Sequence, residues 1–288
     1  MCRWIAYSGG PIYLEELLFK PKHSLIDQSL AARAGETTTN GDGFGVGWYG
    51  TSVTPGIYKN VQPAWSDENL QNLCSQIKSP LFMAHVRSTT GTAVQQTNCH
   101  PFRYGRWLFQ HNGVISDFKL VKRDLVLAIA PDLFAKVAGS TDSEIMFYLA
   151  LTFGMETDVI AGVERMVGFV EEVGRKHGIA EPLQMTLAIM DGQTLYGFRY
   201  SSVGRSRTLF HSASIGTLRK HFPNVRSFSD DARAVVSEPL GAVENASQIW
   251  MEVPESSALI VAAGAVDIIP MRPRTDIAAP SLSEAPAV

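Results

Sequence analysis

The chain opens with Met1-Cys2-Arg3-Trp4-Ile5-Ala6, and the rest of the molecule is organised around the second of these residues. Only 3 of the 288 residues are cysteines, so a cysteine directly behind the initiator is unusual. Initiator methionine is commonly removed before a small residue, and removal would give Cys2 a free α-amine that titrates near pH ~7.7–8.0. One residue would then supply both a nucleophile and its general base. The alternative is a small buried residue at the start of a strand, because free cysteine is often buried.

Composition and charge exclude several classes of protein. The chain is 45% hydrophobic and 18% charged, which is typical of a soluble globular protein. The net charge of −3, without a basic block, lacks the electrostatic footprint of nucleic-acid binding. No apolar run approaches the ~18 residues needed to cross a membrane, and the acidic pair at 15–16 interrupts any signal peptide. We therefore expect a cytoplasmic protein whose partners include neither nucleic acid nor membrane.

The cysteines do not indicate a disulfide framework or a metal site. Their number is odd, and Cys2, Cys74 and Cys99 lack a paired spacing such as C-x-x-C. Cys74 falls on the apolar stripe of a predicted helix over 67–77, so we expect it in the core. We predict that the protein uses no metal and no cofactor.

The order of the predicted elements favours an antiparallel α+β fold. Strands come first, helices follow, and from residue 185 the pattern returns to strands, beginning with a hairpin on Asp191-Gly192. This order differs from the alternation of strand and helix that builds a parallel sheet. We predict one domain over 1–272 and a loose tail over 273–288, which is rich in Ala, Pro and Ser. The expected strands cover 3–7, 81–86, 107–110, 185–190, 194–200, 208–211, 234–237, 248–253, 258–261 and 266–269, and the expected helices 117–129, 141–151 and 157–177.

A strand with glycine at alternate positions follows the turn at Asn40-Gly41-Asp42. Gly43, Gly45 and Gly47 leave one face of this strand without side chains. Such a face admits either another backbone or a ligand at close range, and the sequence favours neither.

Polar residues at the ends of predicted strands and at a helix start suggest a catalytic site. Arg87 offers a planar fork that can bind a carboxylate, and Asp142 can accept from an ammonium group. The side-chain N–H of Asn112 and the backbone N–H of Gly113 can form an oxyanion hole. Together with the thiol, these groups suit attack on the amide of an α-amino acid. Singly, each has another interpretation: a surface ion pair for Arg87, a turn for Asn112-Gly113, and a dipole-favoured acid for Asp142.

These segments resemble the class II glutamine amidotransferases, which have an N-terminal nucleophile and a four-layer αββα sandwich of two antiparallel sheets. The resemblance implies that Cys2 is the nucleophile, that its amine is the base, and that Asn112 and Gly113 form the oxyanion hole. It also implies that Arg87, Thr90 and Asp142 hold the carboxylate and amine of the substrate. The matching motifs are Met1-Cys2-Arg3, Asn40-Gly41-Asp42-Gly43-Phe44-Gly45, Ala84-His85-Val86-Arg87 with Thr90, Asn98-x-His100-Pro101, His111-Asn112-Gly113 and Thr141-Asp142-Ser143-Glu144.

Within that family the chain looks most like a stand-alone branch, which includes γ-glutamyl hydrolases of glutathione breakdown and ergothioneine synthesis. Ser88 and Gly91 stand where the biosynthetic transferases usually carry an aromatic residue and a histidine. The resemblance thus implies an amidohydrolase or glutaminase acting on glutamine or a small molecule with a γ-glutamyl amide. The alternatives are an ammonia-supplying subunit with a synthetase partner and a non-catalytic binding protein. A homo-oligomer is a further possibility that the sequence leaves open.

Overall fold

The computed structural model describes residues 2–33, 39–89, 91–213, 228–241 and 249–274. Met1 and Thr90 lie outside the described residues, as does the predicted tail beyond residue 274. Of the tail predicted over 273–288, Pro273 and Arg274 are described, and the N–H of Arg274 donates to the carbonyl of Glu164 at 3.1 Å.

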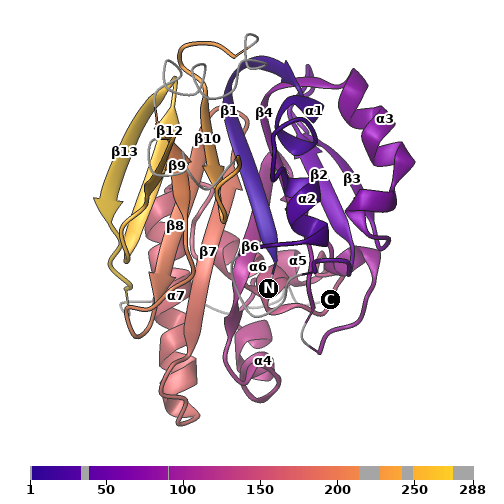
Figure 1. The fold of residues 1–288 in the computed structure, drawn as a ribbon. Coiled ribbons are helices and arrows are strands. Elements are labelled where there is room, and N and C mark those ends of the chain that lie inside the picture. The colour runs from indigo at the N-terminus through magenta and orange to yellow at the C-terminus, as the bar shows by residue number, and fades with distance from the viewer. Residues whose placement is uncertain (1, 34–38, 90, 214–227, 242–248, 275–288) are drawn as a thin grey trace, which may run out of the picture.

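Two antiparallel sheets form the centre of the molecule (Figure 1). The first has the strand order β11-β9-β10-β1-β4-β2-β3, and the second has the order β13-β12-β8-β7-β6-β5. The first sheet consists of β1 (Arg3–Tyr13), β2 (Phe44–Trp48), β3 (Gly56–Asn60), β4 (Lys78–Val86), β9 (Phe210–Ser212), β10 (Arg233–Val236) and β11 (Trp250–Glu252). The second consists of β5 (Phe102–Tyr104), β6 (Trp107–Ile115), β7 (Leu183–Met190), β8 (Leu195–Ser201), β12 (Ser257–Ala262) and β13 (Ala265–Pro270).

Helices cover the outer face of each sheet, which completes the predicted four layers (Figure 1). One apolar core lies between the first sheet and its helices, a second lies between the other sheet and its helices, and a third lies between the sheets. The first sheet carries α1 (Glu15–Leu18), α2 (Leu25–Leu30) and α3 (Glu68–Gln76), with the 3₁₀ turn η1 (Ala64–Ser66). The second carries α4 (Phe118–Leu127), α5 (Pro131–Phe134), α6 (Asp142–Thr152) and α7 (Val159–Lys176), and η2 (Gln96–Asn98) precedes β5.

Alternation along β1 determines which of its residues face the second sheet. Ile5 and Tyr7 pack in the core beneath the helices, whereas Trp4 and Ala6 pack in the core between the sheets. Successive side chains on a strand point to opposite faces. Cys2 therefore shares the inward direction of Trp4 and is directed towards the second sheet.

Two predicted strand ends are wrong. β1 continues through the Gly9-Gly10-Pro11 segment to Tyr13, with an irregular register between Ser8 and Ile12. A side chain on Gly9 would collide with Ala232, so this glycine allows close packing instead of a turn. β6 also continues beyond its predicted end to Ile115, which places the His111-Asn112-Gly113 motif inside a strand.

The glycine-rich strand β2 packs tightly against another part of the backbone. A Cβ on Gly45 would collide with the carbonyl of His100, and one on Gly47 would approach Pro101 and Leu108. Of the two interpretations that the sequence left open, close approach of a backbone is correct.

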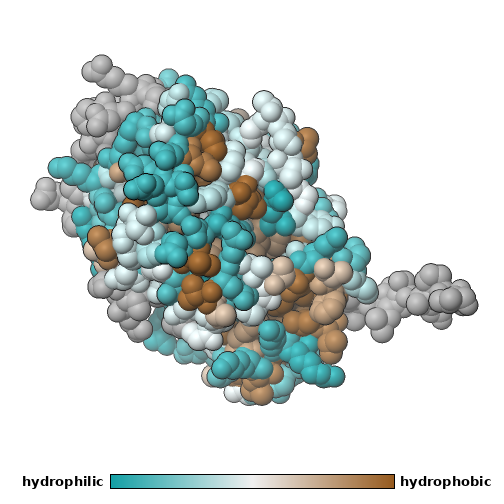
Figure 2. All heavy atoms as spheres, turned by 90° about the vertical axis from the view of Figure 1, so that its right-hand side faces the viewer, coloured by the Kyte–Doolittle hydropathy of each residue, from teal (hydrophilic) through white to brown (hydrophobic). Residues whose placement is uncertain are grey.

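In the part of the chain that the structure describes, no helix is both long and apolar enough to span a bilayer. On the face shown in Figure 2, hydrophobic groups stand between hydrophilic ones over much of the surface and gather towards the lower right. Exposed apolar side chains are normal on protein surfaces.

Candidate active site

The thiol of Cys2 lies at the start of β1 and contacts the chain that leaves β4. The backbone N–H of Ser88 donates to Sγ at 3.4 Å, and Sγ lies 3.5 Å from the Ser88 carbonyl. Strand register explains this contact, because Arg3 pairs with Val86, which brings the residue before β1 next to the residues that follow β4. Burial raises the pKa of the thiol above its ordinary value of 9.0, although the Ser88 contact and the charge of Arg87 oppose the rise. The free thiol is thus protonated at neutral pH and needs a base.

Arg87 is buried at the end of β4, with 3% of its surface exposed. Its guanidinium donates to the carbonyl of Asp42 at 3.3 Å and to the hydroxyls of Thr89 and Thr92 at 3.2 and 2.6 Å. Within the described ranges no carboxylate lies at ion-pair distance from it. The surface ion pair that the sequence left open is therefore wrong. A buried guanidinium with neutral partners is suited to an anionic ligand.

Asp42 supports Arg87 and was not among the predicted site residues. Its N–H donates to the Arg87 carbonyl at 3.0 Å, and the Arg87 N–H donates to the carbonyl of Gly43 at 2.8 Å. Its carboxylate accepts from the N–H of Thr89 at 2.8 Å. The sequence placed Asp42 in a turn but gave no sign that this turn extends the pairing of β2 with β4.

Asn112 lies on β6, in the sheet opposite Cys2, and is buried with 4% of its surface exposed. Its carbonyl accepts from the hydroxyl of Thr186 at 3.3 Å, and that hydroxyl accepts from the indole N–H of Trp4 at 3.3 Å. Because Trp4 belongs to β1, which begins directly after Cys2, this chain of contacts connects the strand behind Cys2 to Asn112. The side-chain amide of Asn112 has no hydrogen-bond partner among the described residues, which leaves its N–H available to a ligand.

Gly113 follows Asn112 on the same strand and has no room for a side chain. An added Cβ would collide with the carbonyl of Gln184 and with the imidazole of His111. The turn that the sequence left open as the other interpretation of Asn112-Gly113 is wrong, because both residues belong to a regular strand paired with β7.

Asp142 is the first residue of α6, as the sequence predicted, behind an N-cap at Thr141. One carboxylate oxygen accepts from the N–H of Ile115 at 2.9 Å, and the other accepts from the N–H of Ser143 at 2.8 Å. Asp142 therefore ties the helix to the end of β6. A carboxylate has further lone pairs, so these bonds still allow it to accept from an ammonium group.

Three buried histidines lie near these residues, and burial keeps them neutral. Burial lowers the pKa of His85 to about 3, and it lowers the pKa values of His100 and His111 as well. His85 stacks on His100 with 4.1 Å between ring centroids, and its Nε2 lies 3.2 Å from the His111 carbonyl. The described contacts of the Cys2 thiol are with Ser88 and not with a histidine. The geometry therefore gives no support to a mechanism in which a histidine side chain is the base for Cys2.

A separate cavity of about 430 Å³ opens at the edge of the sandwich, between β3 and β5. Lys59, Arg103, Lys136 and Glu144 contribute its charged side chains. The lining does not include Cys2 or the four described residues predicted to bind substrate or oxyanion. Strand register and hydrogen bonds therefore place the predicted site residues, and these residues do not line this cavity.

Comparison with known proteins identifies relatives of the chain. The family model for class II glutamine amidotransferases matches residues 21–285. The chain is 32% identical over 294 residues to the probable glutamine amidotransferase DUG3 of Saccharomyces cerevisiae, covering 91% of this chain and 82% of the yeast protein. It is 29% identical over 197 residues to the gamma-glutamyl-hercynylcysteine sulfoxide hydrolase of Mycolicibacterium smegmatis, covering 68% of this chain and 81% of that protein.

Solved structures agree with this fold. A glutamine aminotransferase class-II domain protein from Silicibacter pomeroyi aligns with a TM-score of 0.71 and 31% identity, covering 94% of this chain and all of that chain (100%). A glutamine phosphoribosylpyrophosphate amidotransferase from B. subtilis aligns with a TM-score of 0.62 and 15% identity, covering 95% of this chain and 50% of that chain. The second likeness concerns the fold alone. The family match, the full-length relatives and the fold agree, and the chain belongs to the class II glutamine amidotransferases, as an enzyme of the amidohydrolase type.

Proposed function

We propose that this enzyme cleaves the γ-glutamyl amide of a small molecule through a thioester on Cys2. The observation that carries the proposal is the placement of the Cys2 thiol against Ser88, next to the buried guanidinium of Arg87. A nucleophile and a carboxylate-binding group thus lie at the same end of the first sheet. The family match begins at residue 21, so the role of Cys2 rests on this geometry and on the motif around it.

The substrate would be held by its glutamyl end. Arg87 would bind the α-carboxylate, with Thr90 assisting, and Asp142 would accept from the α-ammonium. Both charged groups already have backbone or hydroxyl partners that fix their directions. Fixing the glutamyl group in this way directs its γ-carbonyl carbon at Cys2, and such positioning lowers the entropic part of the barrier.

The chemistry requires removal of Met1, which gives Cys2 a free α-amine. That amine takes the thiol proton while Sγ bonds to the γ-carbonyl carbon, and the carbonyl oxygen becomes an oxyanion. The side-chain N–H of Asn112 and the backbone N–H of Gly113 stabilise the oxyanion. The C–N bond then breaks as the ammonium of Cys2 protonates the leaving amine, and a thioester remains. Water attacks the thioester with the amine as base, which releases glutamate and restores the thiol.

The γ-substituent is proposed to be larger than the amide of glutamine. Two observations support this choice. Ser88, whose backbone contacts the thiol, has a small side chain where the biosynthetic transferases usually carry an aromatic residue. The mycobacterial relative is named as a hydrolase of a γ-glutamyl compound that carries a large substituent.

A panel of γ-glutamyl compounds, scored by glutamate release, tests the proposal. Intact mass first confirms that Met1 has been removed from the purified protein. Cys2→Ala is expected to abolish turnover, whereas Cys74→Ala, at a buried cysteine of α3, serves as the matched control and retains it. Turnover by Cys2→Ala, or by protein that keeps Met1, would refute the mechanism. Activity on glutamine alone, dependent on a co-purifying synthetase, would instead identify an ammonia-supplying subunit.

A further inference from the structure

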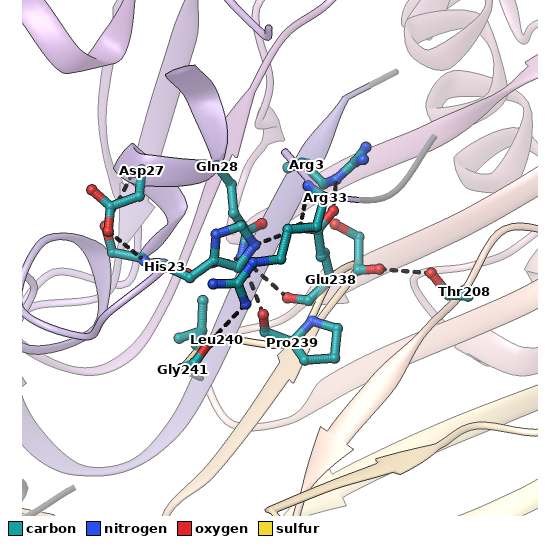
Figure 3. A network of polar contacts seen from close by, with 12 residues as sticks. Arg3, His23, Asp27, Gln28, Arg33, Thr208, Glu238, Pro239, Leu240 and Gly241 are labelled. Atoms are coloured by element: carbon teal, nitrogen blue, oxygen red, sulfur yellow. Dashed lines mark hydrogen bonds and ion pairs between the residues drawn. The ribbon is translucent and has the colours of Figure 1, made fainter. Parts of the chain in front are cut away.

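A buried ion pair joins the residue that follows the nucleophile to the far half of the chain (Figure 3). The Nε atom of Arg3 lies 2.6 Å from a carboxylate oxygen of Glu238, and the two side chains are only 3% and 5% exposed. The same guanidinium donates through Nη1 to the carbonyl of Cys2 at 2.8 Å. Arg3 thus connects a fixed carboxylate to the backbone of the nucleophile.

Glu238 is itself held by several donors. Its other oxygen lies 2.5 Å from Nε2 of His23 and accepts from the backbone N–H of Arg33 at 2.9 Å. Gln28 also donates to the Glu238 carbonyl at 3.4 Å, as Figure 3 shows. These partners come from α2 and its flanking residues, so the carboxylate is fixed from the outer layer of the fold.

The neighbouring backbone extends this attachment. The N–H of Trp4 donates to the hydroxyl of Ser237 at 2.9 Å, and the N–H of Ser237 donates to the Trp4 carbonyl at 3.0 Å. Pairing of β1 with β10 therefore continues one step beyond Ile5–Val236 towards Cys2. Cys2 lies outside the regular strand. Beyond this step the attachment is therefore made by the side chains of Arg3 and Glu238 and not by backbone pairing.

We propose that Arg3 and Glu238 are positioning residues, which hold the Cys2 carbonyl so that its amine and thiol keep one attacking geometry. Chain ends are poorly ordered unless they are tied down, and removal of Met1 would make Cys2 the chain end. A hydrogen bond to the Cys2 carbonyl restricts rotation about the bonds that orient both reactive groups. This inference rests on the proposed role of Cys2 as the nucleophile.

Arg3→Lys separates positioning from folding. Lysine can keep the charge pair with Glu238, but its single nitrogen cannot occupy both the Nε and Nη1 positions of the arginine fork. We expect kcat to fall about tenfold to a hundredfold while KM changes by less than about twofold, because a misplaced nucleophile weakens the transition state more than binding. The melting temperature is expected to stay near that of the parent protein.

The matched control is Arg199→Lys. Arg199 makes the same kind of contacts elsewhere, with Glu252 at 2.6 Å and the carbonyl of Val253 at 2.6 Å. Glu238→Gln is the second test variant, and we expect it to lower kcat in the same way. Intact mass is checked for each variant, so that only processed protein is compared.

The outcomes are distinct. A fall in kcat at constant KM in Arg3→Lys but not in Arg199→Lys supports the positioning role. Unchanged kcat in Arg3→Lys, or an equal loss in Arg199→Lys, overturns it. Turnover by Cys2→Ala, measured alongside, would overturn the proposed function itself, and that result is independent of the ion pair.

Discussion

The Nδ1 atom of His111 lies 2.8 Å from the hydroxyl oxygen of Ser143. His111 immediately precedes Asn112 on β6, and Ser143 immediately follows Asp142 on α6. One hydrogen bond therefore joins the strand of the proposed oxyanion donor, Asn112, to the helix of the proposed ammonium acceptor, Asp142. The relative placement of these two groups depends on this contact and on the bond from Ile115 to Asp142.

Ser143→Ala should weaken this connection. We expect kcat/KM to fall about threefold to tenfold and the free energy of unfolding to fall by about 1 kcal/mol, the usual size for one lost hydrogen bond. Steady-state kinetics and urea denaturation measure the two effects. Ser29→Ala is the control, because the Ser29 hydroxyl is also buried and donates to the Ile26 carbonyl at 2.6 Å. Equal kinetic losses in both variants would contradict a specific role for Ser143.

Asn112→Ala should remove one donor to the proposed oxyanion. Loss of such a donor typically costs ~2.7–4 kcal/mol of barrier, so kcat should fall by a factor on the order of 10²–10³ with little change in KM. Single-turnover kinetics locate the loss in the formation of the thioester. Asn72→Ala, at an exposed position on α3, is the control. A large rise in KM with unchanged kcat would show that Asn112 binds the ground state and not the oxyanion.

Acid should destabilise the protein through Glu238. Burial alone would raise the pKa of this carboxyl, but hydrogen bonds from His23, Arg33 and Arg3 outweigh it and lower the pKa from 4.5 to about 2. Its full stabilisation is present above about pH 4.5. As the pH falls further, the unfolded chain takes up the proton first, so stability is lost until about pH 2. The free energy of unfolding lost over this pH range is about 3 kcal/mol.

Urea denaturation at several pH values tests this dependence. The difference in unfolding free energy between the parent protein and Glu238→Gln should shrink as the pH falls from 4.5 towards 2. Glu181→Gln, at an exposed position, should show no such change in the difference. A difference for Glu238→Gln that is constant across this range would contradict the assignment.

Gly45→Ala should destabilise the contact between β2 and the segment that precedes β5. The added Cβ would collide with the backbone carbonyl of His100, which cannot move away as a flexible side chain can. We expect a loss of about 1–3 kcal/mol in unfolding free energy, as for overpacked cores. Gly50→Ala is the control, since nothing lies within 4 Å of a Cβ at that position. Equal stability of the two variants would show that the backbone at Gly45 adjusts without cost.

The elements that the sequence located best are those whose apolar period is regular. α7 was expected over 157–177 and covers Val159–Lys176, and the hairpin of β7 and β8 turns near Asp191-Gly192 as expected. The Thr141-Asp142-Ser143-Glu144 motif is typical of a capping box, but only half of that box forms. Thr141 accepts from the N–H of Glu144, but the Glu144 side chain accepts from Ala138 and Gly139 instead of returning to the cap.

Contacts between distant segments could not be read from the sequence. The support of Arg87 by Asp42 depends on strand pairing, which local pattern does not reveal. The pairing of Arg3 with Glu238 spans 235 positions, and the sequence gave no signal for Glu238 at all. Motifs therefore predicted the candidate site residues, whereas the residues that contact and hold them became visible only in the fold.

The distance along the chain between Arg3 and Glu238 also sets an order of events during synthesis. At ~5–20 residues per second, the ribosome needs on the order of tens of seconds after Arg3 to reach Glu238. Enzymes that trim the initiator can meet the nascent chain during that interval, before β10 exists to pair with β1. Cys2 would thus be exposed early and enclosed late, so that under the proposed mechanism removal of Met1 would come before the ion pair forms.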